Sequence, residues 1–248
     1  MEKISDPTKW REYFKDDTNF NQEVPFDFKC LSFKLIKASE NPEKLNLFYT
    51  ISSIYDFTKI FEKISSALSL GFSDITKKSE IMRQLFFNNY QDAEDLQDLL
   101  TKEMNLGEEI YKCNGENNGP LGHGSDKYST YVSGCRTFLR LMWFLEYLID
   151  IFEGLLKDDG KGSGKKIVRD SYDKVLSPHH RYLVRKAVGF AFMFSNTGNV
   201  ASLVKLIFGY NEYNQEARDV IKSTIENMKK IWNAGNEFYK KNDLLNLE

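Results

Sequence analysis

Residues 133–155 read SGCRTFLRLMWFLEYLIDIFEGL, and this stretch decides the fold class. Between positions 138 and 152 only Arg140, Glu146 and Asp150 are charged. Bulky apolar residues fall on every side of the 3.6-residue period, which indicates a helix that is buried on most of its faces. A helix of this kind needs other elements around it, so we expect it at the centre of the fold.

Apolar residues also recur with helical spacing on both sides of this central stretch, and the run 187–194 is again apolar on all sides. No segment shows the strict alternation that is typical of a half-buried strand, and we find no internal repeat. The sequence therefore predicts an all-α protein of about eight helices. The expected helical segments are two or more over 26–85, then 93–111, 129–156, one from about 179, 200–208 and 214–238.

Composition restricts the class of partner. The chain has 248 residues with 34 Lys and Arg against 36 Asp and Glu, a net charge of −2 that does not favour nucleic acid as a partner. Its first residues, MEKISDPTKW, lack an apolar signal segment, and no run of about 20 apolar residues predicts a membrane span. Three scattered cysteines favour a reducing compartment, so we expect a cytoplasmic protein.

The five prolines all lie outside the periodic apolar segments, where they mark boundaries. Residues 1–25 are polar and irregular, so we expect an N-terminal extension followed by one domain over 26–248. Stretches rich in glycine, asparagine or lysine predict loops at about 113–128 and at 157–166. The second, KDDGKGSGKK, does not have the spacing of a phosphate-binding loop and follows a helix rather than a strand.

Two arginines carry the most specific chemical signal. Arg136 and Arg140 are four residues apart and so share one helix face. Arg140 lies within the apolar run, and a buried guanidinium keeps its charge and needs an anion. The anion is either a carboxylate of the protein, which is the more common arrangement, or part of a ligand.

Other candidate residues are weaker when taken alone. Asp74 and Lys78 are also four apart, a spacing that an ordinary surface ion pair explains. His180 precedes a helical segment, where histidine is usually a cap or a satisfied polar group. No pattern typical of a catalytic nucleophile or a metal site accompanies them. We therefore predict no catalytic residue, no cofactor and no metal.

Four segments, in this order along the chain, resemble the ceramide-1-phosphate transfer proteins of the glycolipid transfer protein superfamily. The likeness extends from Phe26 to Glu248. The segments are 73–82 (SDITKKSEIM), 133–155 as quoted above, 170–192 (DSYDKVLSPHHRYLVRKAVGFAF) and 233–248 (NAGNEFYKKNDLLNLE).

This resemblance implies a two-layer helical sandwich around an apolar pocket, and a protein that moves one sphingolipid between membranes without covalent chemistry. It implies that Asp74 accepts hydrogen bonds from the ceramide amide and hydroxyl, and that His180 contacts the amide carbonyl or the headgroup. Lys78, Arg136 and Arg140 would bind the phosphate, which supplies the anion that Arg140 needs.

The resemblance also bears on the choice of lipid. Glycolipid-binding relatives have a tryptophan where this chain has Arg140, so we expect a sphingolipid phosphate as the ligand, with a monomeric carrier and transient membrane contact. The motif His180-Arg181-Tyr182 departs from the His-Pro-Trp of the family, which leaves open a lipid sensor or helical interaction module that binds lipid without efficient transfer. Nine apolar residues are candidates for the chain pocket, although ordinary core explains each equally well: Phe61, Phe72, Ile75, Phe138, Tyr147, Leu148, Ile151, Val188 and Phe192.

Overall fold

The expected N-terminal extension, residues 1–25, and most of the loop expected at 113–128 lie outside the residues that the structure describes. The structure is a computed structural model, and its described residues are 26–64, 66–113, 131–193 and 198–247.

Helices make up the fold, and the described residues contain no strand beyond an isolated bridge between Ser163 and Asn199. The predicted all-α class is confirmed, with ten α-helices in the described part of the chain instead of about eight. The helices are α3 (Phe28–Ala38), α4 (Leu47–Ile64), α5 (Ser66–Asn89), α6 (Leu96–Met104), α7 (Glu108–Tyr111), α8 (Gly134–Lys157), α9 (Gly164–Ser171), α10 (Tyr182–Met193), α11 (Val200–Phe208) and α12 (Gln215–Lys241); a π-helical turn η2 (Tyr172–Leu176) and a 3-10 turn η3 (Ser177–His179) connect α9 to α10.

Two local signals explain the additional helices. The segment 93–111 contains α6 and α7 rather than one helix, because Gly107 between them has a φ of +113°, which an L side chain rarely adopts. The loop expected at 157–166 ends earlier than predicted, because the Ser163 side chain accepts a hydrogen bond from the Lys166 backbone N–H and so begins α9 at Gly164.

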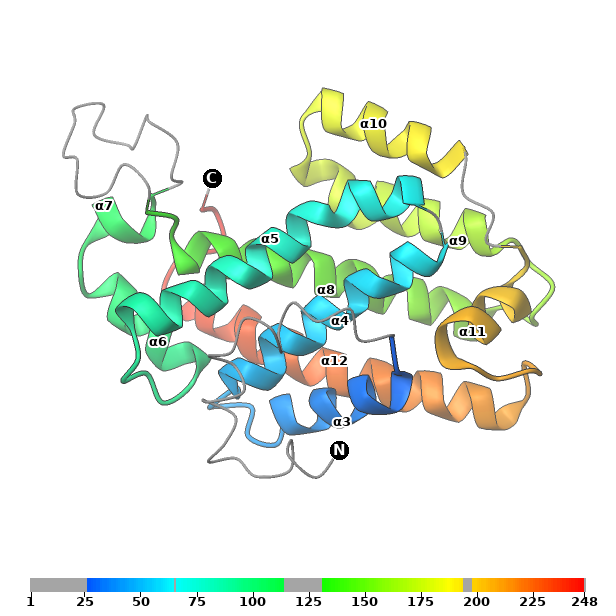
Figure 1. The fold of residues 1–248 in the computed structure, drawn as a ribbon, viewed down its shortest axis with the longest axis horizontal. Helices are drawn as coiled ribbons and strands as arrows, with labels where there is room; N and C mark the ends of the chain where they lie inside the picture. Colours follow the sequence, from blue (N-terminus) through cyan, green and yellow to red (C-terminus); the bar gives the residue numbers. More distant parts are fainter. Residues whose placement is uncertain (1–25, 65, 114–130, 194–197, 248) are drawn as a thin grey trace.

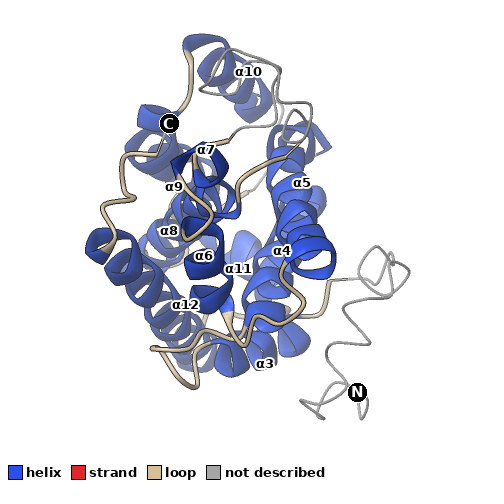
Figure 2. Ribbon diagram, turned by 90° about the vertical axis from the view of Figure 1, so that its left-hand side faces the viewer, coloured by secondary structure: helices blue, strands red, loops and turns tan. Residues whose placement is uncertain are grey.

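The helices form two layers (Figure 2). In one layer α4 packs between α3 and α5, and in the other α8 packs along α12. The layers meet where α5 contacts α8 and where α12 contacts α3, and α8 runs through the middle of the molecule (Figure 1). α11 contacts α4 and α9. This is the sandwich that the resemblance implied.

The central position of α8 follows from its sequence. Its buried side chains come from all sides of the helix, as the apolar run predicted, and Phe138, Phe144 and Leu148 are each at most 1% exposed. The Ser133 side chain caps the helix by accepting from the Arg136 backbone N–H at 3.1 Å.

A buried carboxylate holds the first turn of α8. Glu103 of α6 is fully buried and accepts from the backbone N–H groups of Gly134 at 2.6 Å and Cys135 at 2.7 Å. The hydroxyls of Tyr131 and Ser133 donate to the same carboxylate. A negative charge at a helix N-terminus is stabilised by the helix dipole and by these donors. Glu103 therefore ties α6 to the helix that carries Arg136 and Arg140.

α10 lies at the edge of the molecule, against α5 (Figure 1). The run 187–194 is apolar on all sides in sequence, yet its described residues, 187–193, are not buried on all sides. The buried residues of α10 are Val188, Ala191 and Phe192. Leu183 is 78% exposed and Phe190 is 62% exposed. The hydropathy of the sequence did not predict that one face of α10 is exposed, because an apolar surface helix and a core helix can have the same composition. Among the described residues, none of the helices is long and apolar enough to cross a membrane.

Candidate functional site

Three parts of the fold bring the five predicted polar residues to one region. α5 carries Asp74 and Lys78, α8 carries Arg136 and Arg140, and His180 follows η3 at the start of the α10 segment. α5 packs against both α8 and α10. The residues are close enough for their charges to interact, because Asp74 opposes the lowering of the pKa of both Arg140 and His180.

Arg140 is half-buried, as its position in the apolar run suggested. Burial lowers the pKa of its guanidinium, and the neighbouring positive charge of Arg136 lowers that pKa further, while Asp74 acts in the opposite direction. Its Nη1 donates to the Arg136 carbonyl at 2.8 Å. Within the described residues no carboxylate forms an ion pair with Arg140, so the protein leaves donors of this guanidinium for another acceptor.

Arg136 lies one turn before Arg140, near the capped start of α8. Its Nη1 donates to the carbonyl of Lys112 at 3.0 Å, which orients the side chain toward the segment that follows α7. The two arginines lie one turn apart on the same face of α8, close enough for the charge of Arg136 to act on the pKa of Arg140. Two neighbouring guanidiniums suit the several oxygens of a phosphate group.

Asp74 and Lys78 form an ion pair on α5. Lys78 Nζ lies 2.6 Å from both carboxylate oxygens of Asp74. The Asp74 side chain is 66% exposed and that of Lys78 is 18% exposed. The pair is thus the surface ion pair that the spacing allowed, and the charge of Asp74 also acts on the pKa of Arg140 on α8.

His180 is held by a tyrosine of the π-helical turn. Its Nδ1 lies 2.9 Å from the hydroxyl of Tyr172, and burial raises the pKa of that tyrosine to about 12. Burial also lowers the pKa of His180; His179 and Lys78 lower it further and Asp74 opposes the shift. The imidazole is therefore mostly neutral near pH 7 and can donate one hydrogen bond and accept another.

The structure adds two residues that the sequence analysis did not predict. The ring of His179 stacks on that of Trp143, with centroids 3.7 Å apart and an angle of 9° between the planes. Arg140 Cζ lies 5.4 Å from the centroid of the same indole ring. The position of Trp143 three residues after Arg140 was a sequence signal for this contact, whereas the position of His179 depends on the turns before it.

All nine predicted chain-pocket residues are buried. Phe61 and Phe72 have ring centroids 4.1 Å apart, and both rings stack against Tyr147. Phe192 packs edge-on against Tyr172 at 5.8 Å, which links this apolar interior to His180. Burial agrees equally with a lipid-lined pocket and with ordinary core. The assignment of these residues to a chain pocket therefore stays a prediction.

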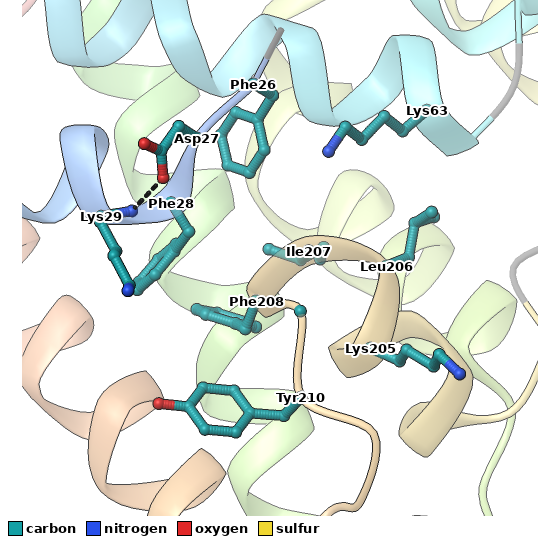
Figure 3. A pocket seen from close by; sticks show the side chains of 11 residues that line it. Phe26, Asp27, Phe28, Lys29, Lys63, Lys205, Leu206, Ile207, Phe208 and Tyr210 are labelled. Carbon is teal, nitrogen blue, oxygen red and sulfur yellow. Dashed lines mark hydrogen bonds between the residues drawn. The ribbon is translucent and has the colours of Figure 1, made fainter.

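Two pockets lie at the surface of the described part of the chain. One, of about 640 Å³, lies under α10 and is lined by Tyr172 and Phe192 together with cationic side chains, among them Arg169 and Arg185. The other, of about 570 Å³, lies between the start of α3, the end of α4 and α11 (Figure 3). In it the Phe28 and Phe208 rings meet edge-on at 4.7 Å, and it includes none of the predicted site residues.

The described residues thus form a two-layer helical sandwich with a cationic cluster beside an aromatic interior. The family model described as "Glycolipid transfer protein (GLTP)" matches residues 49–201, more than half of the chain. The chain belongs to the glycolipid transfer protein family. This family consists of lipid carriers and not of enzymes.

Individual relatives agree with this assignment. The ceramide-1-phosphate transfer protein of Bos taurus is 23% identical over 226 residues, which cover 91% of this chain and 98% of the relative. That of Danio rerio is 28% identical over 154 residues, covering 62% of this chain and 67% of the relative. The crystal structure of human ceramide-1-phosphate transfer protein with 2:0 ceramide-1-phosphate superposes with a TM-score of 0.73 at 20% identity, covering 91% of this chain and 100% of that one, and so shows the same fold.

Proposed function

We propose that this protein binds a sphingolipid phosphate of the ceramide 1-phosphate type and carries it between membranes. The observation that supports this most directly is Arg140, a half-buried guanidinium whose hydrogen bond goes to the Arg136 carbonyl and not to a carboxylate. A phosphate placed there would receive charge-assisted hydrogen bonds, each worth about 1.5–3 kcal/mol. The similarity to ceramide-1-phosphate transfer proteins supports the same ligand.

In this proposal the other polar residues of the site bind different parts of the lipid headgroup. Lys78 and Arg136 join Arg140 on the phosphate, and Asp74 accepts from the amide and hydroxyl of the ceramide. His180 donates to the amide carbonyl while Tyr172 holds its other ring nitrogen. A sugar headgroup would bring no negative charge to compensate the arginines, which is why a phosphate is favoured.

The hydrocarbon chains require a dry pocket. Exposing them to water costs about 0.8 kcal/mol for each CH₂, so a carrier must enclose the chains as it removes them from the bilayer. The stacked rings of Phe61, Phe72 and Tyr147 lie between α4, α5 and α8. In this proposal the rings separate to admit the chains. Apolar contact is not directional, so the headgroup cluster decides which lipid is bound.

α10 provides the membrane contact in this proposal. Tyr182, Leu183 and Phe190 are large apolar side chains that are at least 61% exposed. Arg181 and Arg185 on the same segment suit the phosphates of a bilayer surface. Because His180 precedes this helix directly, docking α10 on a membrane brings the headgroup cluster next to the lipids. We assign this carrier activity to the domain over 26–248.

A vesicle assay tests the proposal. Donor vesicles contain fluorescent ceramide 1-phosphate, and transfer to acceptor vesicles is followed over time, with a fluorescent glucosylceramide as the competing lipid class. We expect transfer of the phosphate lipid by the wild type and a loss of at least tenfold in the rate for Arg140→Leu. Lys222→Leu is the matched control, since it removes one positive charge from an exposed position on α12.

Two outcomes would contradict the proposal. Equal transfer by the wild type and Arg140→Leu would show that the arginine cluster does not bind the phosphate. Binding of ceramide 1-phosphate in native mass spectrometry without transfer would instead identify a lipid sensor, the alternative that the departure at Arg181 and Tyr182 left open.

A further inference from the structure

His179 and Arg140 share one aromatic surface. The His179 ring lies flat on Trp143 with a centroid distance of 3.7 Å, and Arg140 Cζ lies 5.4 Å from the same indole centroid. Trp143 is half-buried and His179 is exposed, so solvent reaches this stack, and Arg140 is the member of the predicted headgroup site that adjoins it. The imidazole is thereby fixed close to the guanidinium that lacks a carboxylate partner among the described residues.

Arg140 and Arg136 carry positive charges one helical turn apart, and such a pair is stabilised by a negative group beside it. In the described part of the chain, the titratable groups that act on His179 or on its neighbours in this cluster come from three helices and the adjacent turn. They are Arg140 and Arg136 from α8, Asp74 and Lys78 from α5, Tyr239 from α12, and His180. Asp74 already pairs with Lys78 at 2.6 Å. Asp74 is therefore engaged by Lys78, and among the described residues Arg140 has no carboxylate in an ion pair with it.

We propose that His179 is a second histidine of the headgroup site, whose protonated ring binds the lipid phosphate together with Arg140 while Trp143 holds it in place. This inference rests on the proposed function and deepens it. It predicts that the site recognises a phosphate monoester in part through a proton that the protein takes up on binding.

The charges around His179 determine how the affinity for the lipid changes with pH. Although the residue is exposed overall, partial desolvation of its ring lowers the pKa of His179, and the positive charge of Arg140 lowers it further. The ring is therefore mostly neutral near pH 7 before lipid is bound. A phosphate dianion reverses this field and raises the pKa of the same ring. Binding then favours the protonated form, and affinity falls as the pH rises through the pKa of the lipid-bound state.

Isothermal titration of 2:0 ceramide 1-phosphate, in buffers of different ionisation enthalpy at pH 7, counts the protons taken up. His179→Phe keeps a flat ring for the stack on Trp143 but cannot bind a proton. His180 and the phosphate titrate in both proteins, so the difference in proton count isolates His179. We expect the wild type to take up more protons, by as much as one for each lipid. Its affinity should fall more steeply between pH 6 and pH 8, by up to tenfold for each pH unit.

Three further measurements test the inference. A short-chain ceramide without phosphate should show no difference in proton count between the wild type and His179→Phe. NMR of ring-labelled histidine should show the pKa of His179 below its usual value in the protein alone and raised once 2:0 ceramide 1-phosphate is bound. Trp143→Leu, which removes the stacking surface, should reduce the proton uptake even though His179 is retained.

The outcomes separate this inference from the proposed function. If the wild type and His179→Phe both bind ceramide 1-phosphate with the same proton count and the same pH dependence, His179 is only a stacking partner of Trp143 and the inference is overturned alone. If the wild type does not bind ceramide 1-phosphate, the proposed function is overturned and the inference with it.

Discussion

Lys78 donates 2.6 Å hydrogen bonds to both carboxylate oxygens of Asp74, so two residues proposed to bind different parts of one lipid are each other's partner. A ligand that brings an anion and hydrogen-bond donors can replace both halves of this pair at once. The phosphate would take the place of the carboxylate at Lys78, and the ceramide amide and hydroxyl would take the place of the ammonium at Asp74. A headgroup with donors and no anion would leave the Lys78 charge uncompensated.

Removing the Lys78 charge should weaken binding of the phosphate lipid. We expect Lys78→Met to reduce the affinity for 2:0 ceramide 1-phosphate about tenfold, because one charge-assisted hydrogen bond is lost. Isothermal titration measures this directly. Lys77→Met is the matched control, since Lys77 is the adjacent residue on α5 and is exposed. The same loss in both variants would indicate a general electrostatic effect and not a specific contact.

Glu103 should be important for stability. In Glu103→Gln one acceptor oxygen is replaced by an amide that faces the N–H groups of Gly134 and Cys135, which now lie 2.6 and 2.7 Å from the carboxylate. We expect the free energy of unfolding in urea to fall by about 2–4 kcal/mol. Glu226→Gln on the exposed face of α12 should change it by less than about 0.5 kcal/mol. An unchanged stability in Glu103→Gln would mean that the start of α8 needs no anionic cap.

Acid should destabilise the protein in part through His180. The pKa of this histidine is lowered in the folded state, mainly by burial, so the unfolded chain binds its proton at a higher pH than the folded protein does. The contribution of the neutral His180 ring to the free energy of unfolding is therefore fully present above the unfolded pKa. It is lost as the pH falls through the folded pKa. The free energy of unfolding in urea should fall less in His180→Gln than in the wild type when the pH is lowered from 7.5 to 5. We expect a difference on the order of 0.5 kcal/mol, because the ring is partly exposed and solvent screens its charge. A larger fall in the free energy of unfolding of the variant would mean that folding raises the pKa of His180 instead of lowering it.

The exposed face of α10 should control membrane association and not stability. The double variant Leu183→Ser, Phe190→Ser should sediment with phosphatidylcholine vesicles at least tenfold more weakly, since each side chain contributes up to about 1.5–3 kcal/mol when buried. Its thermal unfolding should stay close to that of the wild type, because the two side chains are 78% and 62% exposed. Leu106→Ser is the control, since Leu106 is 57% exposed and lies between α6 and α7. Equal weakening by the control would argue against a docking role for α10.

The central helix and the two arginines on it could be predicted from the sequence. A helix has one period, and a buried helix has apolar residues on all sides of that period. The run from Phe138 to Phe152 specified a buried α8, and the spacing of Arg136 and Arg140 placed both on one face. Helix boundaries were less predictable where a single residue decides them. The cap at Ser163 and the positive φ of Gly107 each changed the number of helices.

The candidate site shows the same division. Asp74, Lys78 and His180 were assigned to a lipid headgroup through a resemblance. That resemblance grouped them around one ligand but did not indicate their contacts with other residues of the protein. The stacking of His179 on Trp143 depends on how η3 packs against α8, which no local pattern encodes. The contact between Arg140 and Trp143, by contrast, follows from their spacing of three residues on α8.

The sequence by itself determined which segments are helices and which residues carry charge in apolar surroundings, because both depend on periodicity along the chain. Only the tertiary structure decided which of those charges meet and which apolar faces stay exposed. Glu103 reaches the start of α8 across 31 positions of the chain to Gly134, and α10 presents Leu183 to solvent although its composition is that of a core helix. Both results come from packing between helices that are distant in sequence, and packing of this kind is specified by the shapes of all the surfaces together.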